Sequence, residues 1–240
     1  MAKKKKQSSS ALFQASNAQL DGNLDAKVSD SMPVENKEVL IKSRERVKKY
    51  GEVYTPAWIV SDMCDLVPQL RVDDTSYSLE DKLNYTVFEP TCGNGNFLVE
   101  LLRRKLHFAF SADENDIVIN LFKAVSTLWG IDIQQDNVLE SRERLHEIIV
   151  STYEEHYKSP IPVYLITALD KVLELNIVHG DTLHYVKYDE QGSESELMLN
   201  SWEIKRVDDN IIVTIYDSYL AKPDTDFNPR DVNILDLGDL

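Results

Sequence analysis

The chain has 240 residues and a mass of 27.5 kDa, and 42% of its residues are hydrophobic, which is enough to bury a sizeable core. No apolar run approaches the roughly eighteen residues of a membrane span, and the basic residues 3–6 lead into a polar segment rather than a secretory signal. Two cysteines, Cys64 and Cys92, are too few for a disulfide framework and lack the spacing of structural zinc. We therefore expect a cytoplasmic, metal-free protein that does not cross a membrane.

Charge is unevenly distributed along the chain. The formal net charge of −15 comes from 26 basic and 41 acidic residues. Residues 1–50 hold 11 basic and 6 acidic residues, a net of +5, so residues 51–240 hold 15 basic and 35 acidic, a net of −20. A surface this negative repels nucleic acid unless its basic groups are gathered on one face.

Composition divides the chain into three parts. Residues 1–36 are rich in Ser, Asn, Asp, Gln and Lys, with too few apolar residues to offset the entropy of ordering, so we expect a disordered basic tail. A folded domain is predicted over residues 37–220. Residues 221–240 are polar and acidic, and we expect a C-terminal tail that is poorly ordered or packs on another surface.

The apolar pattern predicts alternating helices and strands. Taken in chain order, it favours a helix ending at Tyr50, a helix from Pro56 capped by Thr55, a strand at 85–89, and helices at 96–108 and 117–122. A strand at 128–133, helices at 135–153 and 161–173, a strand at 175–179 and weaker strands at 185–188, 202–206 and 211–216 follow. This alternation implies parallel strands joined by helical crossovers. The predicted fold class is α/β, a doubly wound, mostly parallel sheet.

A glycine turn follows the first predicted strand. The strand ends at Glu89-Pro90, and Gly93-Asn94-Gly95 then opens a helix, a geometry that lets a ligand approach the backbone at the carboxyl edge of a sheet. Glycine is required where a side chain would fill the ligand's place. The spacing is neither Gly-x-Gly-x-x-Gly nor a phosphate-binding loop, so no pyrophosphate ligand is indicated.

Two acids follow the next two predicted strands. Asp132 ends the strand at 128–133, where its carboxylate can accept hydrogen bonds from both hydroxyls of a ribose. Asp181 follows the strand at 175–179, where it can accept from an adenine amino group. Together with the glycine turn they describe an adenosine pocket without phosphate, for which S-adenosylmethionine is the natural ligand.

Four motifs carry a family resemblance. Residues 89–98, Glu-Pro-Thr-Cys-Gly-Asn-Gly-Asn-Phe-Leu, are similar to the first motif of class I S-adenosylmethionine-dependent methyltransferases, in particular the N6-adenine DNA methyltransferases of restriction-modification systems. Residues 51–56, 130–133 and 176–183 resemble the family's amino-terminal, ribose-binding and adenine-side motifs, in the family's order. The resemblance implies a Rossmann-like fold.

The resemblance also assigns roles. It places Thr55 and Glu89 near the methionine part of the cofactor, the two glycines against the ligand, Asp132 on ribose and Asp181 on adenine. The cofactor-binding residues that it implies are Tyr54, Thr55, Glu89, Pro90, Thr91, Gly93, Gly95, Phe97, Asp132, Ile133, Asp181 and Thr182.

The family's catalytic motif, Asp/Asn/Ser-Pro-Pro-aromatic, holds the amine of a flipped adenine against an aromatic ring. This sequence lacks it. The nearest arrangement is Asp217-Ser218-Tyr219, a predicted strand end with a carboxylate and an aromatic residue but neither proline. Asp217 and Tyr219 are therefore the candidate catalytic pair.

Three functions follow from these observations. The first is a DNA methyltransferase acting on adenine N6 in a bacterial or phage modification system. The second is a catalytically silent or partner-dependent subunit that holds the cofactor, favoured by the missing motif and the −20 charge of residues 51–240. The third is an enzyme acting on a small molecule or protein. The implied partners are DNA, reached directly or through a partner subunit, and a restriction or specificity subunit.

Overall fold

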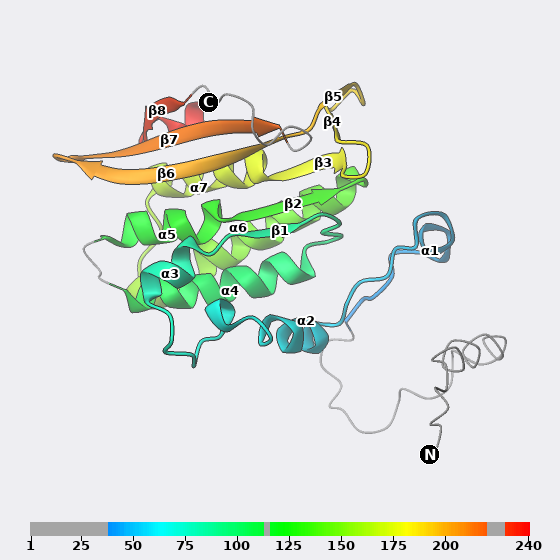
Figure 1. Ribbon diagram of the computed structural model, residues 1–240, viewed down its shortest axis with the longest axis horizontal. Helices are drawn as coiled ribbons and strands as arrows, with labels where there is room; N and C mark the ends of the chain where they lie inside the picture. The colour runs from blue at the N-terminus through cyan, green and yellow to red at the C-terminus, as the bar shows by residue number, and fades with distance from the viewer. Residues whose placement is uncertain (1–37, 113–115, 220–228) are drawn as a thin grey trace, which may run out of the picture. The chain divides into compact units, whose positions relative to one another are not determined.

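The structure is a computed structural model that describes residues 38–112, 116–219 and 229–240. The predicted tail, residues 1–36, lies outside the described residues. Figure 1 shows the elements in chain order: α1 (Arg44–Tyr50), α2 (Ala57–Cys64), η1 (Pro68–Leu70), α3 (Leu79–Asn84), β1 (Val87–Glu89), α4 (Asn96–Ser111), α5 (Ile117–Ser126), β2 (Leu128–Asp132), α6 (Gln135–Tyr157), α7 (Val163–Asn176), β3 (Ile177–Asp181), β4 (Val186–Tyr188), β5 (Glu194–Glu196), β6 (Met198–Val207), β7 (Asn210–Tyr219), β8 (Arg230–Asn233) and η3 (Leu237–Asp239).

The first sheet is mixed and has the order β1-β2-β3-β4-β5. Strands β1, β2 and β3 are parallel, with Glu89 opposite Gly130 and Asp132 opposite His179, whereas β4 and β5 add antiparallel strands. The predictions of an α/β fold and of parallel pairing among the first three strands are confirmed. Because the three strands run the same way, the loops that follow Glu89, Asp132 and Asp181 meet at one edge of the sheet.

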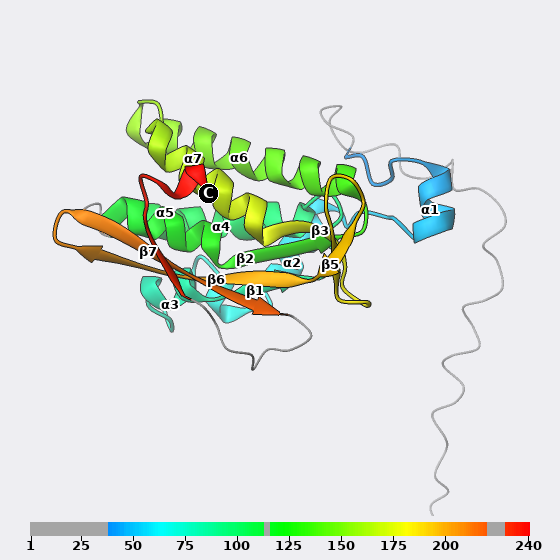
Figure 2. The same cartoon turned by 90° about the horizontal axis from the view of Figure 1, so that it is seen from above.

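Four helices connect the parallel strands and form the core with them. Helices α4 and α5 lie between β1 and β2 in the chain, and α6 and α7 lie between β2 and β3. These helices contact one another and form a layer on one side of the strands (Figure 2). Fully buried leucines such as Leu102, Leu121 and Leu169 fill the layer, which fixes the positions of the strand ends. Within the described residues, none of the helices is long and apolar enough to cross a membrane.

Strands β6, β7 and β8 form a separate antiparallel sheet. This sheet contacts α5 and α7, and Trp202 of β6 contacts both helices. The Trp202 ring packs edge-on against Phe122 of α5, with 5.9 Å between the ring centres, and its Nε1 donates a hydrogen bond to Asn176 Oδ1 of α7 at 2.9 Å. The C-terminal segment was expected to be poorly ordered or to pack on another surface, and residues 229–240 pack on β7 and α7; residues 221–228 lie outside the described residues. Ile234 and Leu237 are buried there, and η3 packs on α7, because these apolar side chains gain more from burial than their acidic neighbours lose.

Helix α2 differs from its prediction. It begins at Ala57 with Pro56 as its N-cap, so Thr55 does not cap it and instead accepts a hydrogen bond from Asn96 Nδ2 at its carbonyl oxygen. Val60 is buried, whereas Met63, three residues further along the helix, is 47% exposed. The helix has only eight residues and contacts α4, so a narrow stripe of it is covered.

Helix α3 was missed, although the sequence held its signal. Ser78 and Asp81 form a reciprocal capping box, a pattern that marks helix starts. At the other end, the buried Lys105 of α4 donates from Nζ to the carbonyl oxygens of Lys82, Leu83 and Tyr85. A tertiary contact thus stabilises the end of a helix that is too short to persist alone.

Candidate functional site: a cavity at the sheet edge

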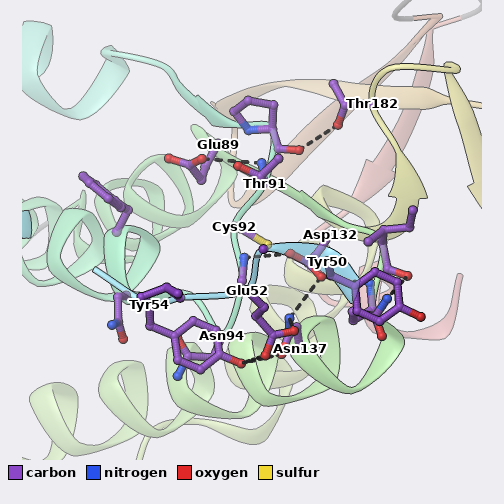
Figure 3. Close-up of a pocket in the computed structure, with 18 of the residues that line it drawn as sticks. Tyr50, Glu52, Tyr54, Glu89, Thr91, Cys92, Asn94, Asp132, Asn137 and Thr182 are labelled. Carbon is purple, nitrogen blue, oxygen red and sulfur yellow. Dashed lines mark hydrogen bonds between the residues drawn. The ribbon is translucent and has the colours of Figure 1, made fainter. Parts of the chain in front are cut away.

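A cavity of about 640 Å³ lies at the carboxyl ends of β1, β2 and β3 (Figure 3). Its volume is in the range of small-molecule sites. The segment that follows α1, the loops after the three strands and the start of α6 contribute its lining. The lining residues are Tyr50, Gly51, Glu52, Val53, Tyr54, Thr55, Glu89, Pro90, Thr91, Cys92, Gly93, Asn94, Asn96, Phe97, Asp132, Ile133, Gln134, Asn137, Gly180, Asp181, Thr182 and Leu183.

Every predicted cofactor residue except Gly95 is among them. Both glycines of the turn have left-handed backbone angles, with φ of +54° at Gly93 and +85° at Gly95. A Cβ at Gly93 would stand 3.2 Å from the Tyr54 ring, whereas one at Gly95 would stand 2.8 Å from Ser141 Oγ. Gly95 was expected to face the ligand, but it serves the close packing of α4 on α6 instead.

Asp132 points toward the glycine turn. Its Oδ2 accepts from the Gly93 N–H at 2.9 Å, and its Oδ1 accepts from the Gln134 N–H at 2.8 Å and from Asn137 Nδ2 at 3.1 Å. A carboxylate has about four lone-pair sites, so these three donors leave one, on Oδ2. This site can accept a hydrogen bond from one ribose hydroxyl, whereas the sequence predicted that Asp132 accepts from both hydroxyls.

A hydrogen-bonded network that the sequence did not indicate continues from Asp132. The Tyr54 hydroxyl lies 2.8 Å from Glu52 Oε1 and 2.9 Å from Asn137 Oδ1, as the dashed lines of Figure 3 show in part. Burial and the neighbouring Glu52 carboxylate raise the pKa of Tyr54, so its hydroxyl remains a donor. Asn137 therefore connects Asp132 to the segment that covers the cavity.

Ion pairs fix this covering segment to α6. Glu52 Oε2 accepts from Arg46 Nε at 2.7 Å, and Arg46 also pairs with Asp136 at the start of α6. Lys42 Nζ lies 2.9 Å from Asp136 Oδ2 and 2.7 Å from Glu140 Oε2. Arg46, followed by Lys42, holds the pKa of Asp136 down at about 2. Residues 42–55 are thereby held against the cavity mostly by charge.

The opposite wall consists of the loops after β1 and β3. Thr182 Oγ1 donates to the carbonyl oxygen of Pro90 at 2.7 Å and joins the two loops. Glu89 accepts from the Thr91 N–H at 3.4 Å, a long contact that leaves most of its acceptor capacity free. Burial raises the pKa of Glu89 above its ordinary value. A cationic group in the cavity would relieve that penalty.

The Asp181 carboxylate accepts hydrogen bonds within the turn that follows β3. Its Oδ1 accepts from the N–H groups of Leu183 and His184, and its Oδ2 lies 2.7 Å from His184 Nδ1. The hydrogen bond from His184 lowers the pKa of Asp181, and the same contact raises the pKa of His184 above 6.5. Asp181 lines the cavity, but an adenine amino group must share or displace the His184 ring to reach Oδ2.

The lining has a one-sided electrostatic character. Among the described residues it contains four acidic side chains, Glu52, Glu89, Asp132 and Asp181, and no Lys, Arg or His. Outside the lining, Arg46 pairs with Glu52 and His184 contacts Asp181, so Glu89 and Asp132 are the acids without a basic partner in the described part of the chain. Ile133 and Leu183 are largely exposed at its mouth and offer apolar surface to a flat ring. Such a cavity repels phosphate groups and attracts a ligand that carries positive charge.

Of the candidate catalytic pair, Asp217 does not line this cavity. Asp217 lies on β7, where its Oδ1 accepts from Asn200 Nδ2 at 2.7 Å and from Arg230 Nη2 at 3.2 Å. Tyr219 ends the same strand, and its side chain lies outside the described part. Cys92 is buried in the glycine loop, and burial raises the pKa of its thiol, which disfavours a nucleophilic role.

No protein-family model matches the chain, and neither the curated proteins nor the solved structures give a match.

Proposed function

We propose that the protein binds S-adenosylmethionine in this cavity and belongs to a DNA adenine-N6 methylation system of a bacterium or phage. The observation that carries the proposal is the electrostatic character of the lining, four carboxylates without a basic side chain. Nucleotides that bind through phosphates need the opposite lining. S-adenosylmethionine joins an adenosine to a sulfonium, an ammonium and a carboxylate group, and its net charge of about +1 suits this lining.

The position of the ligand follows from the acceptors that remain free. We place the ribose on the open site of Asp132 Oδ2, the adenine between Ile133 and Leu183 near Asp181, and the ammonium near Glu89. The Tyr54 ring, which rests on Gly93, closes the cavity above the turn. In this proposal the fold is the doubly wound, Rossmann-like fold of class I methyltransferases.

A partner-dependent subunit is the second candidate, and the position of Asp217 favours it. Its Oδ1 is already bonded to Asn200 and Arg230, and the residue is absent from the cavity lining. Under this candidate the chain holds the methyl donor, while a partner subunit supplies the acceptors for the target amine and a restriction or specificity subunit completes the system.

Calorimetry with four ligands tests the shared premise. The expected order of affinity is S-adenosylmethionine first, then the uncharged-sulfur analogue S-adenosylhomocysteine, then adenosine, with no binding of ATP, because each step removes a group that the lining attracts or adds one that it repels. ATP binding with an affinity equal to that of S-adenosylmethionine would contradict the proposal.

Transfer of a labelled methyl group separates the candidates. Label entering adenine N6 of unmethylated genomic DNA with the chain alone supports the enzyme. Label entering DNA only when neighbouring gene products are added supports the partner-dependent subunit. Label entering protein or metabolites and not DNA refutes both and favours a methyltransferase with another acceptor.

A further inference from the structure

Among the described residues, basic side chains gather beside the cavity, in residues 38–50. Residues 1–50 have a net charge of +5, whereas residues 51–240 have a net charge of −20 and include the four acidic side chains of the lining. In the described part of residues 1–50, the basic residues gather in and around α1. Residues 38–50 hold five basic and two acidic residues, so a polyanion would meet more positive charge there than along the acidic remainder of the chain.

Helix α1 has two distinct faces. Each residue turns a helix by about 100°, so Arg46, Val47 and Tyr50 share one side, and Arg44, Lys48 and Lys49 share the other. The first side makes the ion pairs to Glu52 and Asp136. The second side is exposed and contains one acid, Glu45.

Of the three exposed cations, Lys49 contacts the Tyr50 ring, whereas Arg44 and Lys48 are not among the residues whose ion pairs hold α1 in place. Helix α1 buries none of its residues, so its place depends on the Arg46 side. Lys49 Nζ lies 4.8 Å above the centre of the Tyr50 ring, and Tyr50 lines the cavity. A positive charge therefore lies at the rim of the cavity but not inside it. There it would attract the phosphates of a ligand that extends beyond the cavity, while the carboxylates of the lining bind the methyl donor.

We infer that the outward face of α1, defined by Arg44, Lys48 and Lys49, binds the phosphate backbone of duplex DNA next to the methyl-donor cavity. Seven helical residues extend over about 10 Å, which matches about three phosphates of one strand, since these repeat every 3.4 Å along the duplex axis. The inference rests on the proposed function, and it names the surface that would hold the substrate.

Salt-dependent DNA binding by the full chain tests the inference. Fluorescence anisotropy with a labelled DNA duplex is measured from 50 to 200 mM salt for wild type, for the triple variant Arg44→Glu, Lys48→Glu, Lys49→Glu, and for the corresponding triple Gln variant. The matched control reverses three exposed cations outside α1 by Arg103→Glu, Lys158→Glu and Lys205→Glu, which changes the net charge equally. Calorimetry with S-adenosylmethionine on each variant reports whether the cavity is intact.

The expected result is weaker DNA binding by both α1 variants, with a plot of log affinity against log salt flatter by roughly 2 to 3, because each lost phosphate contact removes about 0.9 from the slope. The control should keep the wild-type slope. Equal slopes in wild type and α1 variants would overturn the inference, as would poly-glutamate competing as well as DNA of equal charge. If S-adenosylmethionine binds neither wild type nor any variant, the proposed function fails. The slopes of DNA affinity against salt then still decide whether α1 binds DNA.

Discussion

Asp132→Asn removes the charge on which the site is organised and keeps the size of the side chain. Three donors converge on the carboxylate, from Gly93, Gln134 and Asn137, and the residue is only 9% exposed. An amide accepts at one oxygen only, so at least one of these donors must face an NH₂ group in the interior. Losing one charge-assisted bond, at about 1.5–3 kcal/mol, and the charge assistance of the other two gives a destabilisation of about 3–5 kcal/mol.

Thermal unfolding and titration calorimetry with S-adenosylmethionine measure the two consequences of this change. The melting temperature should fall by roughly 6–20 °C for a domain of this size, and S-adenosylmethionine should bind about 10- to 150-fold more weakly if its ribose uses the open site on Oδ2. Asp62→Asn, at an exposed carboxylate on α2, is the control and should change stability by less than about 0.5 kcal/mol. A loss below about 1 kcal/mol together with unchanged affinity would refute both the network and the ribose assignment.

Two further predictions follow from single contacts. Gly95→Ala should destabilise the protein by about 2–3 kcal/mol, because φ is +85° and the new Cβ would meet Ser141. The control Gly192→Ala, at φ of +79° with open space around it, should cost only about 1 kcal/mol. Equal losses of stability in thermal unfolding would show that the contact with Ser141 is unimportant. His184 should titrate above 6.5 by NMR and return toward 6.5 in Asp181→Asn. Because the folded-state pKa of His184 is raised, the stabilisation from this pair is present below pH 6.5 and is lost as pH rises through the raised pKa. A His184 ring that titrates at 6.5 in both wild type and Asp181→Asn would contradict the contact.

The spacing of apolar residues in the sequence was enough to predict most strands and helices of the first sheet. Buried runs such as residues 128–132 and the apolar stripe of α4 depend on short-range periodicity, which is visible in the sequence. The sequence left open whether the end of the chain is ordered, because its apolar residues, Ile234 and Leu237 among them, are interspersed with polar and acidic ones. Their burial depends on α7, which lies far away in the chain, and no local pattern reports such a contact.

The sequence by itself determined which strand ends carry glycine and acid, and thereby that Gly93, Asp132 and Asp181 lie at one edge of a parallel sheet. Only the tertiary structure decided that Asn137 and Glu52 connect Asp132 to the covering segment, that Gly95 serves packing, and that Asp217 does not line the cavity. The physical reason is range: strand ends follow from periodicity within a few residues, whereas hydrogen bonds between residues more than eighty positions apart depend on how the whole chain packs.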